Sequence, residues 1–206
     1  MYAIVEDSNI IQFINYPKSV VIDEVRYPAK IFEIWTTEEK EAIGIYEVIV
    51  DKTNYKDTSY YNNTSSSYTF EDGQVTESWG TATAKHLDDL LWTQEDKDNG
   101  DLPKTSSIGD VKVIGLKNQK KNIIKKQASS LLEKTDWHNH KALDDDTYTI
   151  PENVKTYRAN VRSKSNEMET QIDACTTVDE LKELYEYTEQ EDGTQTRPLA
   201  EFPEEI

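Results

Sequence analysis

Two histidines and three consecutive aspartates have the residue types and spacing that come nearest to a metal-binding arrangement. His138 and His140 form a His-x-His pair, and Asp144, Asp145 and Asp146 follow them. Such a pair on a strand can chelate zinc, and carboxylates can complete the ligand set. This segment, however, is typical of a helix-to-helix loop, and a metal site also needs partners that orient each ligand. We therefore predict no bound metal here.

The single cysteine, Cys175, is the candidate for nucleophilic catalysis with a distant histidine. Neither a G-x-S-x-G elbow nor a glycine-rich phosphate loop accompanies it. A buried, inert thiol is the ordinary role of such a residue, and a lone cysteine predicts a reducing compartment. We expect no catalytic residue, no cofactor and no enzymatic activity. A metal-dependent or cysteine hydrolase is the alternative from another functional class.

The charge of the chain narrows the classes of partner. The 206 residues carry a formal net charge of −17, which repels nucleic-acid phosphates and anionic lipids alike. We expect no nucleic-acid and no membrane partner, and the amino-terminal residues indicate neither a signal peptide nor a transmembrane helix. A basic run, residues 117–126, lies in a helical pattern. It is predicted to be a solvated helix face, with contact to an acidic partner as the alternative.

Apolar, β-branched runs predict a β-rich amino-terminal domain over residues 1–93. A strand, a tight turn and a second strand are expected over residues 2–14. A capping box formed by Thr36 and Glu39 predicts a short helix that ends at Gly44, and a third strand is expected over residues 45–50. Asp72-Gly73 predicts a hairpin turn. Residues 51–67 are expected to bury little, and residues 86–92 to form a helical turn or two.

The carboxyl-terminal half is predicted to be helical, which makes the fold class α+β. Residues 94–110 are acidic and turn-rich and are expected to be a linker, followed by a helical domain over residues 111–188. A long helix is predicted to begin near Val111, with Gly115 as a kink or as its true start. A returning helix follows Pro151, and a short helix is capped by Thr177 and Glu180. Residues 189–206 are expected to form an extended acidic tail.

The two long helices should fold back on each other as a hairpin. Five apolar side chains are expected to pack between them: Leu131, Leu132, Trp137, Tyr157 and Val161. Either Arg158 or Arg162 is expected to hold Asp136 in a charge-assisted hydrogen bond that fixes the turn. Because Trp, Tyr and Arg are also the favoured anchors of protein interfaces, a structural role and a partner-binding role can coexist here.

Two segments of this hairpin resemble a known signature. Leu131-Leu132 with Thr135-Asp136-Trp137, followed by Tyr157-Arg158 and Arg162, is similar to a motif of bacteriophage tail assembly chaperones and tail-fibre assembly proteins. The resemblance extends over most of residues 1–165, through the opening strand, Tyr16-Pro17, the helix start at Thr36, residues 44–48 and Asp72-Gly73. Val161 stands where the family usually has leucine, and the loop from His138 to Pro151 is long and acidic.

The resemblance implies a viral tail protein that acts by protein–protein binding in the assembly of tails or tail fibres. Its expected partners are phage tail, tail-fibre or baseplate proteins, in an assembly that can hold several copies. Its expected location is the virion tail, and the host cytoplasm during assembly. A purely structural fibre, adaptor or baseplate subunit is the alternative within the same biology.

Overall fold

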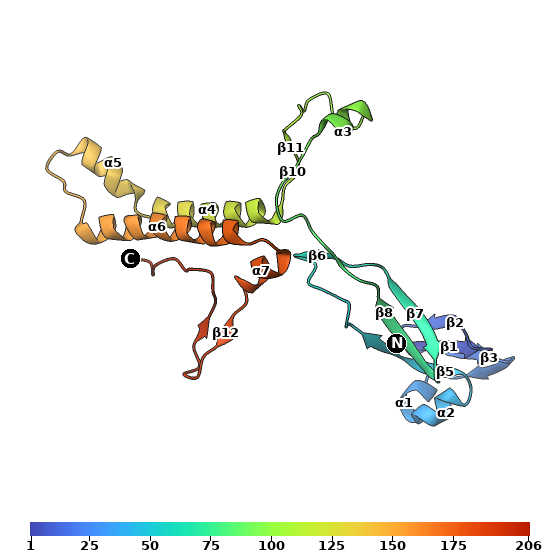
Figure 1. Cartoon of the computed structure of the whole chain (residues 1–206). Helices are drawn as coiled ribbons and strands as arrows, with labels where there is room; N and C mark the ends of the chain where they lie inside the picture. Colours follow the sequence, from blue (N-terminus) through green and yellow to red (C-terminus); the bar gives the residue numbers. More distant parts are fainter. The chain divides into compact units, whose positions relative to one another are not determined.

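The structure is a computed structural model that describes residues 1–206. It is a mixed α+β protein, as predicted, and it divides into two compact units, Met1–Thr83 and Ala84–Ile206 (Figure 1). The division falls before residues 94–110, so the segment expected to link two domains lies inside the second unit. Each unit is described separately below.

The first unit is built on a five-stranded sheet with the order β2-β1-β5-β8-β7. Its strands are β1 (Tyr2–Glu6), β2 (Asn9–Ile14), β5 (Ile45–Asp51), β7 (Ser66–Glu71) and β8 (Gln74–Trp79). The pairing of β5 with β8 is parallel and the other pairings are antiparallel. The predicted hairpin at Asp72-Gly73 is confirmed, because both residues have positive φ (51° and 76°), as a tight turn of this kind requires.

At β1 both faces of this sheet are covered, which explains why this strand does not alternate between buried and exposed residues. Ala3, Ile4 and Val5 are all buried. Ile4 packs in a cluster with Ile14 and Ile45 on one side, whereas Ala3 and Val5 pack with Val48 and Val75 on the other. The sheet is curled, since Phe13 of β2 and Tyr68 of β7 bring their ring centroids within 4.4 Å although these strands are its two edges.

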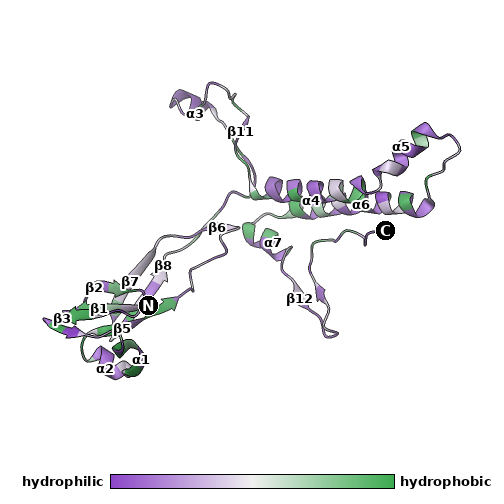
Figure 2. Ribbon diagram, turned by 180° about the vertical axis from the view of Figure 1, so that it is seen from behind, coloured by the Kyte–Doolittle hydropathy of each residue, from purple (hydrophilic) through white to green (hydrophobic).

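A small hairpin and the first of two short helices add residues to the cluster that contains Ile4. The hairpin and the two helices are β3 (Val20–Ile22), β4 (Val25–Tyr27), α1 (Ile31–Ile34) and α2 (Thr37–Glu41). Figure 2 shows α1 as hydrophobic and α2 as hydrophilic, in agreement with the buried Ile31 and Phe32 on α1. The predicted capping box of α2 is confirmed: Thr36 N donates to Glu39 Oε2 at 2.9 Å, and Glu39 N donates to Thr36 Oγ1 at 3.2 Å.

Residues 51–67 hold more structure than their polarity suggested. Tyr60 and Tyr61 are buried, which corrects the expectation that this stretch buries little. Strand β6 (Tyr61–Asn62) pairs with β9 (Thr83–Ala84). The loop before β6 is closed by Asn63, whose side chain accepts from Lys56 N at 2.8 Å and donates to Lys56 O at 2.7 Å.

Residues 86–115 form a pair of short strands with a short helix between them, and not the predicted helical turn followed by an open linker. These elements are β10 (Leu90–Leu91), α3 (Gln94–Asp98) and β11 (Val111–Val113). Residues 86–92 were expected to be helical and Val111 to begin the long helix, and both expectations were wrong. Two backbone hydrogen bonds join the ends of this segment: Trp92 N donates to Asp110 O at 2.9 Å, and Gly109 N donates to Trp92 O at 2.8 Å.

Four helices follow in the second unit: α4 (Leu116–Glu133), α5 (Asp136–Asp144), α6 (Glu152–Ala174) and α7 (Val178–Glu183). Gly115 is the residue immediately before α4, so it marks the true start of the helix and not a kink. A Cβ at Gly115 would lie 2.3 Å from Asp88 C, which requires glycine. The predicted capping box at Thr177 and Glu180 is confirmed. None of the helices combines the length and the apolar character needed to span a membrane.

The last residues are attached to the helices and are not a free tail. After β12 (Thr188–Glu189) and β13 (Gln195–Thr196), Leu199 is buried and its N–H donates to Leu184 O at 3.0 Å. The Gln171 side chain binds the same segment twice, donating to Pro198 O at 3.0 Å and accepting from Ala200 N at 2.8 Å. Residues 198–202 of the expected extended tail are packed against the helices, because Leu199 and Phe202 supply apolar surface that the helices cover.

Gly44→Ala should destabilise the first unit more than Gly73→Ala. Both glycines have left-handed backbones, with φ of +78° and +76°, which cost an L-residue about 1–2 kcal/mol. Only at Gly44 would the new Cβ meet backbone, 2.7 Å from Val5 O, whereas Gly73 faces open space. We expect losses of about 2–4 and about 1–2 kcal/mol in urea unfolding followed through the amide signals of β1 and β5. Equal losses would contradict the close approach.

Asp96 should titrate well below an ordinary aspartate. The hydrogen bond from Lys112 is the largest cause, and bonds from the Thr93 side chain and backbone add to it, lowering the pKa of Asp96 from 3.8 to about 2. Because the folded pKa is depressed, the stabilisation is complete above the unfolded value and is lost as pH falls through about 2. NMR titration of the Thr93 and Asp96 amides measures the midpoint. Lys112→Met should move it upward, and an unchanged midpoint would contradict the assignment.

Candidate functional site

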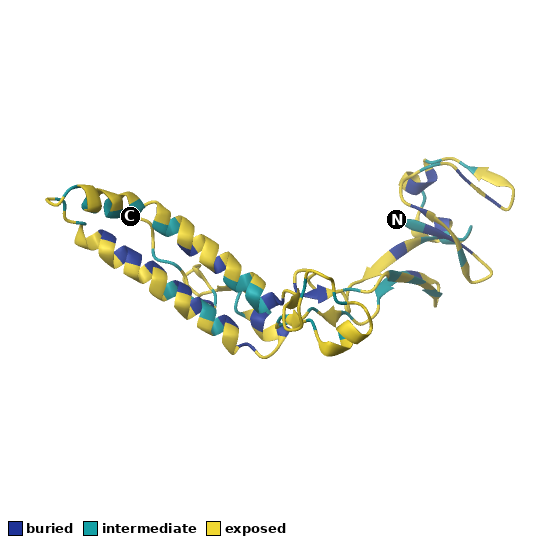
Figure 3. Cartoon of the chain, turned by 90° about the horizontal axis from the view of Figure 1, so that it is seen from above, coloured by how far each residue is buried: buried dark blue, intermediate teal, exposed yellow.

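The candidate site lies on α4, α5 and α6 of the second unit. Helices α4 and α6 lie side by side, and Figure 3 shows buried positions recurring along them. Ala128 of α4 packs with Tyr157 and Val161 of α6, and Leu131, Leu132 and Phe202 pack partly buried against these three. The seam is therefore closed on a third side by the carboxyl-terminal segment, a contribution that the helical pattern alone did not reveal.

Arg158 fixes the end of α4 from the opposite helix. Its Nη1 donates to Leu132 O at 2.8 Å and to Thr135 Oγ1 at 2.7 Å, and its Nη2 lies 2.7 Å from Asp136 Oδ1. The last carbonyls of a helix have no partner within the helix, and a cation is favourable beside them. The guanidinium, which is largely buried, thus satisfies the end of α4 and also holds the first residue of α5.

Of the two arginines considered for the contact with Asp136, the structure selects Arg158. Arg162 is exposed, and its Nη1 makes a long contact of 3.5 Å with Arg158 O, one turn earlier on the same helix. Arg162 therefore does not reach the turn. The sequence could not separate the two because they are four residues apart on neighbouring turns of one helix face.

Trp137 does not pack between the helices, which corrects the expectation for this residue. Its side chain is 54% exposed on α5, and its ring stacks on that of His138 with centroids 3.7 Å apart. Tyr148 lies beside them, with its ring centroid 6.4 Å from that of Trp137. The seam between α4 and α6 is already filled by Tyr157, Val161 and Phe202, so the Trp137 indole is not part of it.

The predicted loop from His138 to Pro151 is in part helical, because α5 continues to Asp144. His138 Nδ1 is hydrogen-bonded to Tyr148 Oη, which ties the end of this segment back to its start. His140 is exposed. No group of three or more His, Cys, Asp or Glu side chains is gathered as a metal site would need.

Cys175 is buried at the end of α6, where its Sγ lies 3.5 Å from Gln171 O. Burial is the main cause that raises the pKa of the Cys175 thiol, and the charge of Glu180 raises it further. The thiolate is the reactive form of cysteine. The surroundings of Cys175 thus favour the unreactive thiol.

Three of the five lysines in the basic run on α4 are paired with carboxylates within the chain. Lys117 pairs with Asp88 at 3.1 Å, Lys121 with Asp173 at 2.7 Å, and Lys125 with Glu169 at 3.2 Å. Asp173 and Glu169 belong to α6, so two of these pairs join the two long helices. This run is therefore part of the helix pairing as well as a solvated face.

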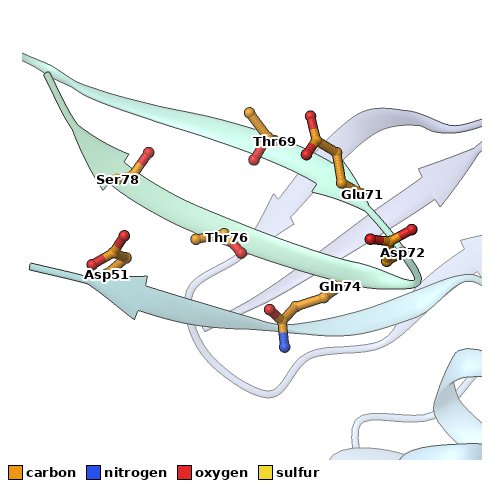
Figure 4. A pocket seen from close by; sticks show the side chains of 7 residues that line it. All are labelled: Asp51, Thr69, Glu71, Asp72, Gln74, Thr76 and Ser78. Carbon is orange, nitrogen blue, oxygen red and sulfur yellow. The ribbon is translucent and has the colours of Figure 1, made fainter. Parts of the chain in front are cut away.

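A second feature, a polar hollow on the first unit, was not anticipated from the sequence. It has a volume of about 570 Å³ and is lined by β5, β7, β8 and their turn (Figure 4). Its lining residues are Asp51, Thr69, Glu71, Asp72, Gln74, Thr76 and Ser78. Hydrogen bonds from the Thr53 side chain and backbone lower the pKa of Asp51, so its carboxylate is already engaged. The hollow offers hydroxyls and carboxylates on an open sheet face and no histidine or cysteine.

Comparison of the chain with protein-family models, with curated proteins and with solved structures found no match. The resemblance to phage tail assembly proteins therefore rests on the sequence motifs described above.

Arg158→Met should lower the free energy of unfolding of the second unit by about 2–4 kcal/mol. The variant leaves Thr135 Oγ1 without this donor, removes a donor from Leu132 O and removes the partner of Asp136, and hydrogen bonds to charged groups are worth about 1.5–3 kcal/mol each. Arg162→Met, one turn away and exposed, should change stability by less than about 0.5 kcal/mol. Urea unfolding followed by the amide signals of α4 and α6 measures both. Similar losses in the two variants would show that Arg158 has no special role.

Proposed function

We propose that this chain is a bacteriophage tail protein that acts by protein–protein binding in the assembly of tails or tail fibres. The resemblance carried by Leu131-Leu132, Thr135–Trp137, Tyr157-Arg158 and Arg162 gives the biology. The mode of action is inferred from the aromatic surface of α5, by which we mean the exposed Trp137 ring stacked on His138. Arg158 holds the first turn of this helix. The expected partners are tail, tail-fibre or baseplate proteins, in the virion tail or in the cytoplasm of the infected host.

The proposal divides the seven candidate residues into two roles. Leu131, Leu132 and Tyr157 fill the seam between the helices, and Arg158 with Asp136 fixes the turn. Trp137 faces solvent, and Leu143 on the same helix is 81% exposed. An exposed Trp side chain on a preorganised turn favours binding, because little conformational entropy remains to be lost on association. Arg162 is exposed on α6 and is available as a polar contact at the rim.

The finer organisation is part of the same proposal. The β-rich amino-terminal region would act as a separately folding domain, while the helical hairpin and the final segment would form the partner-binding part. Residues 189–206 support this division, because Leu199 and Phe202 are packed against the helices of the second unit.

The proposal treats the chain as a binding protein and not as an enzyme. One observation supports it: the Cys175 side chain is buried with a raised pKa, which disfavours the reactive thiolate. A purely structural fibre, adaptor or baseplate subunit remains the second candidate. Mass spectrometry of purified virions separates the two, since a structural subunit is present in stoichiometric amounts and a transient assembly factor is not.

Trp137→Ala should weaken partner binding while leaving the helices folded. Interface anchors of this type contribute at least about 2 kcal/mol, which corresponds to a loss of roughly 30-fold in affinity. The measurement is recovery of tail, fibre or baseplate proteins from infected-cell lysate by tagged wild-type and variant chains, followed by titration of the purified partner.

Ile123→Ala is the matched control, because Ile123 is 50% exposed on α4 of the same unit. It should bind like the wild type. If Trp137→Ala is folded and binds the same proteins as tightly, the aromatic surface is not the interface. If the wild type recovers no tail, fibre or baseplate protein, the proposed biology fails.

A further inference from the structure

Strands β10 and β11 and the residues next to them expose several aliphatic side chains. We call residues 90–114 the apolar ribbon. Six of its side chains are between 36% and 50% exposed: Leu90, Leu91, Ile108, Val111, Val113 and Ile114. Single exposed aliphatic residues are ordinary, whereas a larger contiguous apolar patch marks an interaction site. Across the strand pair, Leu90 lies opposite Val113 and Leu91 lies opposite Val111. None of these six side chains belongs to the apolar clusters described above for the two units.

The apolar ribbon is held in shape by polar contacts at its base. Asp89 accepts hydrogen bonds from Gly115 N at 2.7 Å and from the Asn118 side chain at 3.0 Å, and so caps the start of α4. Leu116 N donates to His86 O at 2.9 Å, which adds a backbone connection at the same place. The glycine at position 115 allows this approach, as shown above.

Polar contacts also hold the part of the apolar ribbon around Lys112 in place. Lys112 pairs with Asp96 and places its Nζ 4.6 Å from the centre of the Trp92 ring. An isolated two-stranded ribbon is marginally stable in water. Here the polar network supplies the order, so the aliphatic side chains remain available for a partner.

The ribbon can accept an additional strand. β10 and β11 pair with each other alone, so the outer edge of each has no neighbouring strand. An extended peptide can add to such an edge through main-chain hydrogen bonds, while its alternate side chains give specificity. Aliphatic side chains beside the edge favour β-branched or aliphatic residues in that peptide.

The net negative charge around the apolar ribbon favours a positively charged partner. Between residues 88 and 113 there are seven Asp or Glu residues and three Lys residues. A second copy of this chain would bring the same excess of negative charge, within a total of −17, and would be repelled. A segment rich in Lys or Arg would be attracted.

We propose that the apolar ribbon is a docking site for an extended segment of another protein in which basic residues alternate with β-branched or aliphatic ones. The segment adds as a third strand at the edge of β10 or β11. This site is distinct from the aromatic surface of α5, and it does not depend on the proposed role in tail assembly.

Selection from a random peptide library on the immobilised full-length chain tests the sequence preference without assuming it. Enriched peptides should show Lys or Arg alternating with Val, Ile or Leu, and should shift the amide signals of Leu90–Trp92 and Val111–Val113. Enrichment of acidic, proline-rich or helix-forming peptides would overturn the proposal. So would the absence of any enriched peptide, or a concentration-dependent shift of the same amides by the chain alone.

Matched variants test the contacts with an enriched peptide. Val111→Thr with Val113→Thr keeps strand propensity and should weaken binding about tenfold, as expected for two lost methyl contacts. Glu95→Gln with Asp101→Asn should weaken binding severalfold at low salt and have less effect at high salt. Glu183→Gln with Glu191→Gln removes the same charge away from the ribbon and should have no comparable effect. Binding that is unchanged in the first pair, or equally weakened in the two charge pairs, would overturn the proposal.

Discussion

The arrangement of the second unit depends on one buried cation. Arg158 reaches from α6 to Leu132 O, Thr135 Oγ1 and Asp136, and so connects the end of α4, the turn and the start of α5. A buried guanidinium is tolerated only where its donors are satisfied and its charge is paired. The same contacts that stabilise the arginine therefore define where α4 ends and in which direction α5 begins.

This constraint explains how an exposed indole can be held in place. The seam between α4 and α6 is filled by Ala128, Tyr157 and Val161, and Phe202 covers it from the carboxyl-terminal segment. Trp137 is thus free to face solvent, where it stacks on His138. The apolar ribbon follows a similar logic, because Asp89 and Lys112 maintain its shape through polar contacts. Polar networks hold both exposed apolar surfaces in position.

Local signals in the sequence predicted local structure well, whereas long-range contacts were missed. The capping boxes at Thr36 and Thr177 and the Asp72-Gly73 turn each depend on residues within a few positions of one another. The hairpin at Asp23-Glu24 was missed because glutamate seldom adopts the positive φ found at Glu24 (62°). Trp137 was misplaced because helical spacing does not reveal that Phe202, distant in sequence, occupies the seam.

The dynamics of the Trp137 indole test the central claim most directly. If Arg158 holds the turn that presents this ring, ¹⁵N relaxation of the indole N–H should report a rigid ring in the wild-type chain. In the Arg158→Met variant the ring should become flexible on the nanosecond timescale, while the amides of α6 around Val161 remain ordered. An indole that is equally rigid in both chains, or already flexible in the wild type, would contradict the account.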